Sequence, residues 1–379
     1  MADVRSVSIT EEGCNNNSLR REQLIIGRRD MKRITVFLTA TVLMLLVCYR
    51  WESPIQPQLL GFSAFTSLQP IPTKQDSNKT NLYESKDVRS LEDIMREAAT
   101  EEKTVIITFL NRAWAEPNSI FDLFIESFHV GQGTKRLLRH LVVICLDEKA
   151  YSRCLKVYPH RCYFLKTAGV DFSGQKNYMT QDYLKMMWRR IEFLGSLLKL
   201  GYSFISTDMD IMWLRDPFPR LFSKGDFQVS CDSYNGNSMD KRNLVNTGFY
   251  FVQANQRTVK FYNYWYSSRS RFGGKKDQDV FNKIKHDRYI TKKLGLTIRF
   301  LDTVYFRGFC QMRREMSKVI TMHANCCFGL QNKIFDLRQV LEDWNAYISA
   351  AGTVDGRKMR WRSPDHCWGR VKKTKKTRV

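Results

Sequence analysis

The stretch that decides the fold of this chain is Gly201-Tyr-Ser-Phe-Ile-Ser-Thr-Asp208-Met-Asp210-Ile-Met-Trp-Leu-Arg-Asp216-Pro217. An apolar run typical of a buried strand ends there in two aspartates that are two residues apart. Successive strand residues point to opposite faces, so Asp208 and Asp210 are predicted to point the same way. Two carboxylates on one face repel each other unless a cation lies between them, and hard divalent cations bind carboxylate oxygens. The stretch therefore predicts a divalent-metal site at the end of a strand.

The residues around the aspartate pair narrow this interpretation, because such pairs are common by chance. Ile211-Met212 follow the pair, which excludes the calcium-loop pattern of EF-hand proteins. Trp213 is expected in the core, and Asp216 before Pro217 is expected to be a turn residue. In α/β proteins, ligands bind outside the carboxyl ends of the strands. The context therefore predicts a ligand site at this edge of a sheet.

Strand-like and helical patterns alternate through the larger part of the chain. Apolar runs predict strands at 104–110, 141–146 and 202–206, and helical periodicity predicts helices at 90–99, 117–128, 178–200 and 335–349. Further strands are expected at 227–230, 246–252 and 318–323. This order is typical of a mostly parallel α/β sheet. The first strand is not followed by the G-x-G-x-x-G fingerprint, so a dinucleotide oxidoreductase is not supported.

An uncharged run from Ile34 to Tyr49 lies near the start of the chain. It is shorter than the roughly 20 residues of a typical membrane span, but Arg50 can snorkel and Trp51 can lie at the interface. A cleaved signal peptide and a buried core helix are the alternatives. The signal peptide is disfavoured because the run starts far from the N-terminus and no small-x-small cleavage site follows it. We expect a signal anchor at 34–50.

Charge predicts the orientation of this anchor. Basic residues precede the run, whereas Glu52 and a polar segment follow it, so the N-terminus is expected in the cytosol. A short span favours Golgi over plasma membrane. The expected protein is a single-pass type II Golgi membrane protein, with Asn78-Lys-Thr80 as an N-glycosylation sequon in its stem. Its predicted parts are a cytosolic tail at 1–33, the anchor at 34–50, a luminal stem at 51–87, a catalytic domain at 88–365 and a basic tail at 366–379.

Composition limits the possible partners. The formal net charge is +23, which by itself favours nucleic acid, but a luminal domain does not meet nucleic acid. A nucleotide-diphosphate donor and an acidic polysaccharide are the preferred partners. Cysteines beyond the anchor number eight, an even set that suits disulfides, and Cys154 with Cys162 is the favoured pair. They form no paired C-x-x-C units, which argues against structural zinc.

Blocks of sequence in a fixed order carry a resemblance to a known family. They are Thr108-Phe-Leu-Asn111-Arg-Ala-Trp114-Ala-Glu-Pro117, the stretch from Asp208 to Pro217, Asn246-Thr-Gly248, Asp277-Gln278-Asp279 and His323-Ala-Asn-Cys-Cys327. Over residues 88–350 the chain resembles the plant nucleotide-diphospho-sugar transferases of glycosyltransferase family seventy-seven. The resemblance implies a GT-A fold, a metal-dependent nucleotide-sugar site, Golgi residence and transfer with retention. Similar enzymes are arabinosyl- and xylosyltransferases that act on cell-wall glycoproteins or pectin.

The resemblance also implies roles for single residues. Asp208 and Asp210 match the Asp-x-Asp element, in which Asp210 holds the metal and Asp208 holds the metal or the ribose. His323 matches a late histidine ligand, so these three residues are expected to bind Mn²⁺ or Mg²⁺; a buried histidine bonded to the backbone is the alternative. Thr108 and Asn111 lie where the nucleotide of a UDP-sugar would bind.

Other positions keep two interpretations. Asp277 and Asp279 either orient the acceptor and stabilise an oxocarbenium-like state, or cap a helix. Similar enzymes often continue with Gly-x-x-Lys-Pro-Trp, which this chain lacks after Gly329, so a diphosphate role for Lys333 is doubtful. Arg189 and Arg190 either reach a phosphate or lie on a solvated helix face, and the solvated face is the favoured interpretation. For the whole protein, a catalytically inactive GT-A scaffold and a luminal sugar-binding module with a calcium site are the alternatives to an enzyme.

Overall fold

The computed structural model describes residues 89–167, 179–313 and 315–369. All of these residues belong to one compact unit. The expected cytosolic tail, anchor at 34–50, stem and sequon, and most of the basic tail, lie outside the described residues. Within those three described ranges, no helix combines the length and apolarity needed to cross a membrane.

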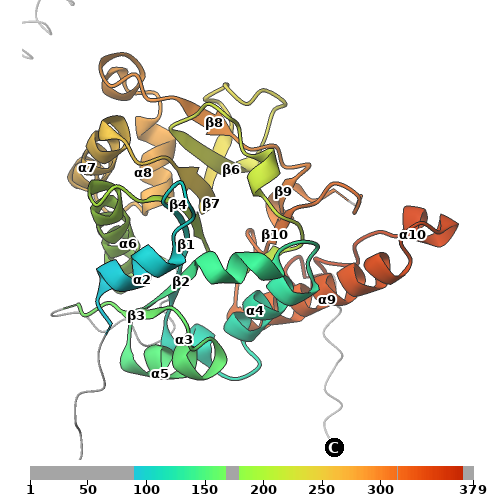
Figure 1. Ribbon diagram of the computed structural model, residues 1–379. Helices are drawn as coiled ribbons and strands as arrows, with labels where there is room; N and C mark the ends of the chain where they lie inside the picture. Colours follow the sequence, from blue (N-terminus) through green and yellow to red (C-terminus); the bar gives the residue numbers. More distant parts are fainter. Residues whose placement is uncertain (1–88, 168–178, 314, 370–379) are drawn as a thin grey trace, which may run out of the picture. The chain divides into compact units, whose positions relative to one another are not determined.

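A seven-stranded sheet with the order β3-β2-β1-β4-β7-β6-β8 forms the centre of the described unit (Figure 1). Its pairs are parallel except where β7 joins β4 and β6, so β7 alone of these seven strands runs in the opposite direction. The predicted α/β fold with a mixed, mostly parallel sheet is confirmed. The strands are β1 (Thr104–Leu110), β2 (Leu141–Cys145), β3 (Cys162–Phe164), β4 (Ser203–Thr207), β6 (Phe227–Ser233), β7 (Leu244–Val252) and β8 (Ile298–Phe300).

The inner strands are buried on both faces. All seven residues of β1 are buried, and they alternate between two apolar clusters: Ile106 and Leu110 join one, whereas Val105, Ile107 and Phe109 join the other. This alternation follows from the two-residue period of a strand. The continuous apolar run at 104–110 therefore correctly predicts a strand that is covered on both faces.

Helices cover the two faces of the sheet (Figure 1). One apolar cluster contains residues of α2 (Leu91–Ala98), α6 (Gln181–Lys199), α7 (Gln256–Arg271) and α8 (Asp277–Ile284). The other contains residues of α4 (Ile120–Val130), α5 (Glu148–Val157) and α9 (Leu330–Ser349). The short helices α3 (Arg112–Ala115) and α10 (Val354–Lys358) complete the set of described α-helices. As predicted, Ser90 caps the first of these helices through the N–H of Asp93.

A second, three-stranded sheet brings distant segments to the end of β4. In it, β10 (Thr321–His323) lies between β5 (Ile211–Trp213), to which it is antiparallel, and β9 (Phe306–Gly308), to which it is parallel. The register pairs His323 with Ile211, which directly follows Asp210. Trp213 is fully buried, as predicted. The small sheet therefore places the late histidine beside the aspartate pair.

Three disulfides lie in the described part of the chain. The predicted pair Cys154–Cys162 is present, and the others are Cys310–Cys326 and Cys327–Cys367. Cys145 and Cys231 are buried as free thiols. Adjacent cysteines thus tie the segment after β10 both to the segment after β9 and to the C-terminal segment.

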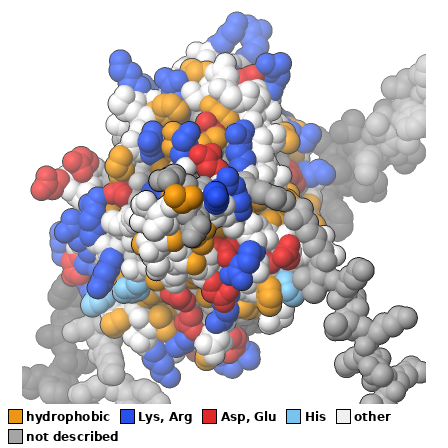
Figure 2. Space-filling model, turned by 90° about the vertical axis from the view of Figure 1, so that its right-hand side faces the viewer, with side chains coloured by type: hydrophobic (Ala, Val, Ile, Leu, Met, Phe, Trp, Pro, Cys, Tyr) orange, Lys and Arg blue, Asp and Glu red, His pale blue; other side chains and the backbone are white. Residues whose placement is uncertain are grey.

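The excess positive charge is dispersed over the face shown in Figure 2. Lysine and arginine side chains are interspersed there with acidic and apolar ones rather than gathered in one stripe. A continuous basic stripe is the usual footprint of nucleic-acid binding. This face therefore shows no continuous basic stripe.

Candidate active site

The aspartate pair lies in the turn that joins the two sheets. Asp208 follows the last residue of β4, and Asp210 precedes the first residue of β5. The backbone N–H of Asp208 donates to the carbonyl of Gly248 on β7 (2.7 Å). The two aspartates are therefore not strand residues, but a carboxylate oxygen of each lies within 4.8 Å of the other, and both residues line one cavity. The prediction that they face the same way is correct for this reason.

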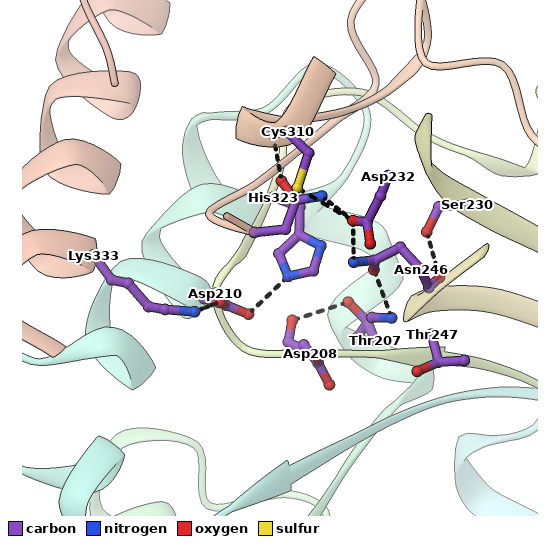
Figure 3. A network of polar contacts seen from close by, with 12 residues as sticks. Thr207, Asp208, Asp210, Ser230, Asp232, Asn246, Thr247, Cys310, His323 and Lys333 are labelled. Carbon is purple, nitrogen blue, oxygen red and sulfur yellow. Dashed lines mark hydrogen bonds and ion pairs between the residues drawn. The ribbon is translucent and has the colours of Figure 1, made fainter. Parts of the chain in front are cut away.

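Asp208, Asp210 and His323 lie close enough together to share one cation (Figure 3). One ligand atom from each residue lies within 4.8 Å of the others. Nε2 of His323 is 3.3 Å from Oδ1 of Asp210, and this buried oxygen accepts no hydrogen bond from any residue that the structure describes. Two potential metal-ligand atoms thus lie side by side. Carboxylates with one imidazole are a ligand set that suits Mn²⁺ or Mg²⁺.

Each carboxylate also contacts a basic side chain. Nζ of Lys333 lies 2.5 Å from Oδ2 of Asp210, and the guanidinium of Arg190 lies 2.6 Å from Oδ1 of Asp208. Burial acts to raise the pKa of Asp210, but Lys333 and His323 hold it below its usual range. Asp210 is therefore ionised, as a metal ligand must be.

Two expectations change at these basic residues. Arg190 was expected on a solvated helix face, but its side chain on α6 is only 15% exposed and pairs with Asp208. Lys333 was doubtful because the surrounding motif differs, yet one turn into α9 its ammonium enters the cavity. Both corrections have the same cause, since the position of a helix in the fold determines which of its faces meets the site.

Glycine at position 248 leaves room for the ring of His323. A Cβ atom at position 248 would lie 2.4 Å from Cε1 of His323. The N–H of Gly248 donates to the side-chain oxygen of Asn246 (2.8 Å). The absent side chain therefore leaves the space in which the His323 ring lies.

Asp232 on β6 is a residue of this cavity that the sequence analysis did not identify. Its carboxylate accepts hydrogen bonds from the side-chain amides of Asn246 (2.8 Å), Gln278 (2.9 Å) and Asn325 (2.8 Å). Sγ of Cys310 lies 3.3 Å from Oδ1 as a contact without a proton, since that sulfur belongs to a disulfide. The network joins four segments of the chain, and Figure 3 shows its members Asp232 and Asn246 beside His323.

Asp277 and Asp279 lie in the first turn of α8, where the helix dipole stabilises carboxylates. The N-cap position is Lys276, so neither aspartate is the capping residue. Asp277 is buried and accepts a hydrogen bond from the hydroxyl of Thr247 (3.2 Å). Burial raises the pKa of Asp277, although Arg190 acts in the opposite direction. Asp279 lines the cavity, and no described side chain pairs with its carboxylate.

The two residues expected at the nucleotide differ in position. Asn111 caps α3 by accepting from the N–H of Trp114 (3.3 Å), and it lines the cavity. Thr108 is fully buried within β1 on the side of Ile106 and Leu110, and it is not among the residues that line the cavity. Among described residues, its hydroxyl has no hydrogen-bond partner. A nucleotide contact therefore stays a prediction for both residues. Of the two, only Asn111 lines the cavity in which a nucleotide could bind.

The cavity that contains these groups has a volume of about 660 Å³. Ligand sites commonly measure about 300–1,000 Å³ and combine an apolar lining with a few convergent polar groups. Here the apolar part includes Phe109, Trp114 and Phe328. The polar part includes Asn111, Arg190, Asp208, Asp210, Asp232, Asn246, Asp277, Asp279, His323 and Lys333. The cavity can hold an anionic ligand through a cation and two basic side chains.

Comparisons with known proteins identify the relatives of this chain. The family model described as nucleotide-diphospho-sugar transferase matches residues 136–337. An uncharacterized protein of Arabidopsis thaliana is 60% identical over 299 residues, which are 78% of this chain and 79% of that protein. Beta-arabinofuranosyltransferase RAY1 of Arabidopsis thaliana is 26% identical over 122 residues, 29% of this chain and 23% of that protein. The crystal structure of mouse xyloside xylosyltransferase 1 superposes with a TM-score of 0.36 at 12% identity, covering 59% of this chain and 98% of that one.

Proposed function

Because this chain belongs to the nucleotide-diphospho-sugar transferase family and is a glycosyltransferase, we propose that it transfers a pentose from a UDP-sugar to a hydroxyl of a cell-wall glycoprotein or polysaccharide. Arabinose or xylose is the preferred sugar, with Mn²⁺ or Mg²⁺ as the cofactor and retention of configuration. The observation that carries the proposal is the cluster of Asp208, Asp210 and His323 in a cavity that also holds Lys333. The similarity to an arabinofuranosyltransferase supports the choice of a pentose.

The chemistry follows from charge. During transfer, the bond between the anomeric carbon and the diphosphate oxygen breaks, and a bond from the acceptor oxygen forms. When bound, the divalent cation neutralises charge on the departing diphosphate, and such electrostatic stabilisation is commonly the largest catalytic contribution. Asp208, Asp210 and His323 would hold that cation, and the ammonium of Lys333 adds positive charge in the same cavity.

Other residues of the cavity provide for the acceptor. With retention, the acceptor proton passes to an oxygen of the departing phosphate, so no protein base is required. Asp279 carries a carboxylate that no described side chain occupies and is suited to orient the acceptor hydroxyl or to face the positive charge that develops on the sugar. Asp277 is buried with a raised pKa and a hydroxyl partner, which suits it to position Thr247 and Arg190 rather than to contact the acceptor.

We further propose that the protein works in the Golgi lumen, anchored through residues 34–50. The disulfides at Cys154–Cys162, Cys310–Cys326 and Cys327–Cys367 support an oxidising compartment. A catalytically inactive scaffold has no need for a buried, ionised Asp210 opposite a histidine. A calcium-dependent sugar-binding module is also disfavoured, because calcium prefers an all-oxygen ligand set to one that includes imidazole.

The test is thermal unfolding of the purified full chain with UDP, in the presence and absence of Mn²⁺. A ligand at 100 times its dissociation constant stabilises a protein by about 2.7 kcal/mol. We expect stabilisation by UDP that requires Mn²⁺ and disappears in Asp210→Asn. Asp182→Asn, at an exposed position in the first turn of α6, is the matched control and should respond like the wild type. Absence of any UDP effect on the folded wild type would overturn the proposed donor.

The sugar is tested separately. Release of UDP from UDP-arabinofuranose, UDP-xylose, UDP-galactose and UDP-glucose is measured with the same protein and Mn²⁺. A preference for one of the two pentose donors supports the proposal, whereas faster turnover of a hexose donor contradicts the pentose assignment and leaves the UDP site intact.

A further inference from the structure

A second cavity, of about 640 Å³, lies outside the ends of β6 and β8. It receives Tyr234 and Ser238 from the segment after β6, and Asp302 and Tyr305 from the segment after β8. The remaining lining comes from Arg220, Phe222, Gly236, Asn237, Leu301 and Phe306. Because β6 and β8 are parallel to each other and to β4, their carboxyl ends meet at the sheet edge that carries Asp208. This is the edge at which α/β proteins bind ligands.

The two cavities share a wall. Asp232 lines the first cavity and Tyr234, two residues later, lines the second. The N–H of Tyr234 donates to the side-chain oxygen of Gln311 (2.9 Å), and the Gln311 amide donates back to the Tyr234 carbonyl (3.3 Å). Gln311 directly follows Cys310, which lines the first cavity. A ligand that fills the second cavity therefore lies beside the reaction site rather than on a remote surface.

The lining of the second cavity combines aromatic rings with unused hydrogen-bonding groups. Phe222, Tyr234 and Tyr305 supply the rings. Within the described part of the chain, the hydroxyls of Tyr234 and Tyr305 have no hydrogen-bond partner, and neither has the hydroxyl of Ser238. Asp302 uses only one carboxylate oxygen, which accepts from the N–H of Val304 (2.8 Å). Aromatic rings lie here beside free hydrogen-bond donors and acceptors. Such a lining suits a ligand that has one apolar face and hydroxyl groups around its edge.

The charges exclude other classes of ligand. Arg220 is the lone cation of the lining, and its guanidinium lies over the ring of Tyr305, 4.4 Å from the centroid. Asp302 brings a negative charge to the same cavity that offsets the charge of Arg220, so the lining has no net positive charge to attract a phosphate or a polyanion. A wholly apolar partner would bury the tyrosine hydroxyls and the second carboxylate oxygen of Asp302 without hydrogen bonds, which is costly. A neutral sugar chain carries no charge, and its hydroxyls can pair with the polar groups of the lining.

We propose that the second cavity binds neutral sugar residues of the acceptor, away from the hydroxyl that reacts. The C–H faces of the sugar rings pack on Tyr234 and Tyr305, and the sugar hydroxyls pair with the tyrosine hydroxyls, Ser238 and Asp302. This inference rests on the proposed transferase function, because it assigns the acceptor to that reaction. Binding energy from such a distant part of a substrate is available to position the reacting hydroxyl. Oligosaccharides should therefore be better acceptors than the corresponding monosaccharides.

Binding of neutral tetrasaccharides to the full chain tests the proposal without requiring turnover. Arabinotetraose, xylotetraose and galactotetraose are titrated by calorimetry up to about 10 mM, tenfold above a dissociation constant of 1 mM. We expect at least one of them to bind the wild type, and Tyr234→Ala/Tyr305→Ala to bind it at least about tenfold more weakly. Phe335→Ala removes an exposed ring on α9 outside the cavity and should bind like the wild type. If the alanine variant does not fold, Tyr234→Phe/Tyr305→Phe keeps the rings, removes both hydroxyls and should weaken binding severalfold.

The thermal shift with UDP and Mn²⁺ is measured on the same samples. If the wild type responds to UDP but binds none of the tetrasaccharides, or if the folded double variant binds them as the wild type does, the second cavity is not an acceptor site and the proposed donor chemistry stands. If tetrasaccharides bind the wild type and the double variant loses that binding, but UDP has no effect, the cavity is a carbohydrate site and the proposed transferase function fails.

Discussion

Substitution of Gly248 by alanine tests the geometry of the candidate metal site directly. The new Cβ would lie 2.4 Å from Cε1 of His323 and 2.8 Å from the side-chain oxygen of Asn246. Real Cβ atoms do not approach other heavy atoms so closely, so the histidine ring must shift from its present position. Overpacking of a buried site costs about 1–3 kcal/mol. Displacement of one ligand should also weaken metal binding, by about the 10- to 100-fold that follows loss of a ligand's supporting contacts.

The assay is a calorimetric titration of the full chain with Mn²⁺, combined with urea unfolding. We expect Gly248→Ala to bind Mn²⁺ about 10- to 100-fold more weakly, which is about 1.4–2.7 kcal/mol. Its free energy of unfolding should fall by about 1–3 kcal/mol. Both effects have one cause, the lost space for the ring of His323.

Gly195→Ala is the matched control. Gly195 lies inside α6, and a Cβ there would approach Tyr262 no closer than 3.5 Å, which is an ordinary van der Waals contact. Replacing a helical glycine by alanine should raise the free energy of unfolding by about 0.5–1 kcal/mol and leave Mn²⁺ affinity unchanged. If Gly248→Ala binds Mn²⁺ as tightly as the wild type does, His323 is not the third ligand and the reasoning fails.

Two further predictions concern the charges of the site. Burial raises the pKa of Asp277 above its ordinary value of 3.8, so its ionisation opposes folding at neutral pH. Asp277→Asn should therefore raise the free energy of unfolding at pH 7, and this gain should shrink as the pH falls to about 4; urea unfolding at several pH values checks this, and a constant difference would contradict it. Lys333→Met removes the ammonium 2.5 Å from Asp210 and should destabilise the metal-free protein by about 3–5 kcal/mol, with partial recovery on addition of Mn²⁺. Equal unfolding temperatures with and without Mn²⁺ in this variant would refute the shared site.

The sequence was most informative where the signal is local. An apolar run followed by aspartates at 208 and 210 correctly predicts a buried strand and a pair of carboxylates that line one cavity. Cys154 and Cys162 pair as predicted because only eight positions separate them and the closed loop is short. No such local signal predicts that Cys326 pairs with Cys310 and Cys327 with Cys367. These partners come together only once β9, β10 and the C-terminal segment have packed.

The residues that balance the charges of the site could not be found in this way. Asp232 accepts from amides that are 14, 46 and 93 positions away in the chain, and a single aspartate after a strand gives no sign of such partners. For Arg190 and Lys333 the sequence left a phosphate contact open, and only the placement of α6 and α9 shows that they pair with Asp208 and Asp210. A strand-end pattern predicts ligands because ligand geometry is local. The groups that neutralise those ligands must approach from other elements, so only the assembled fold can identify them.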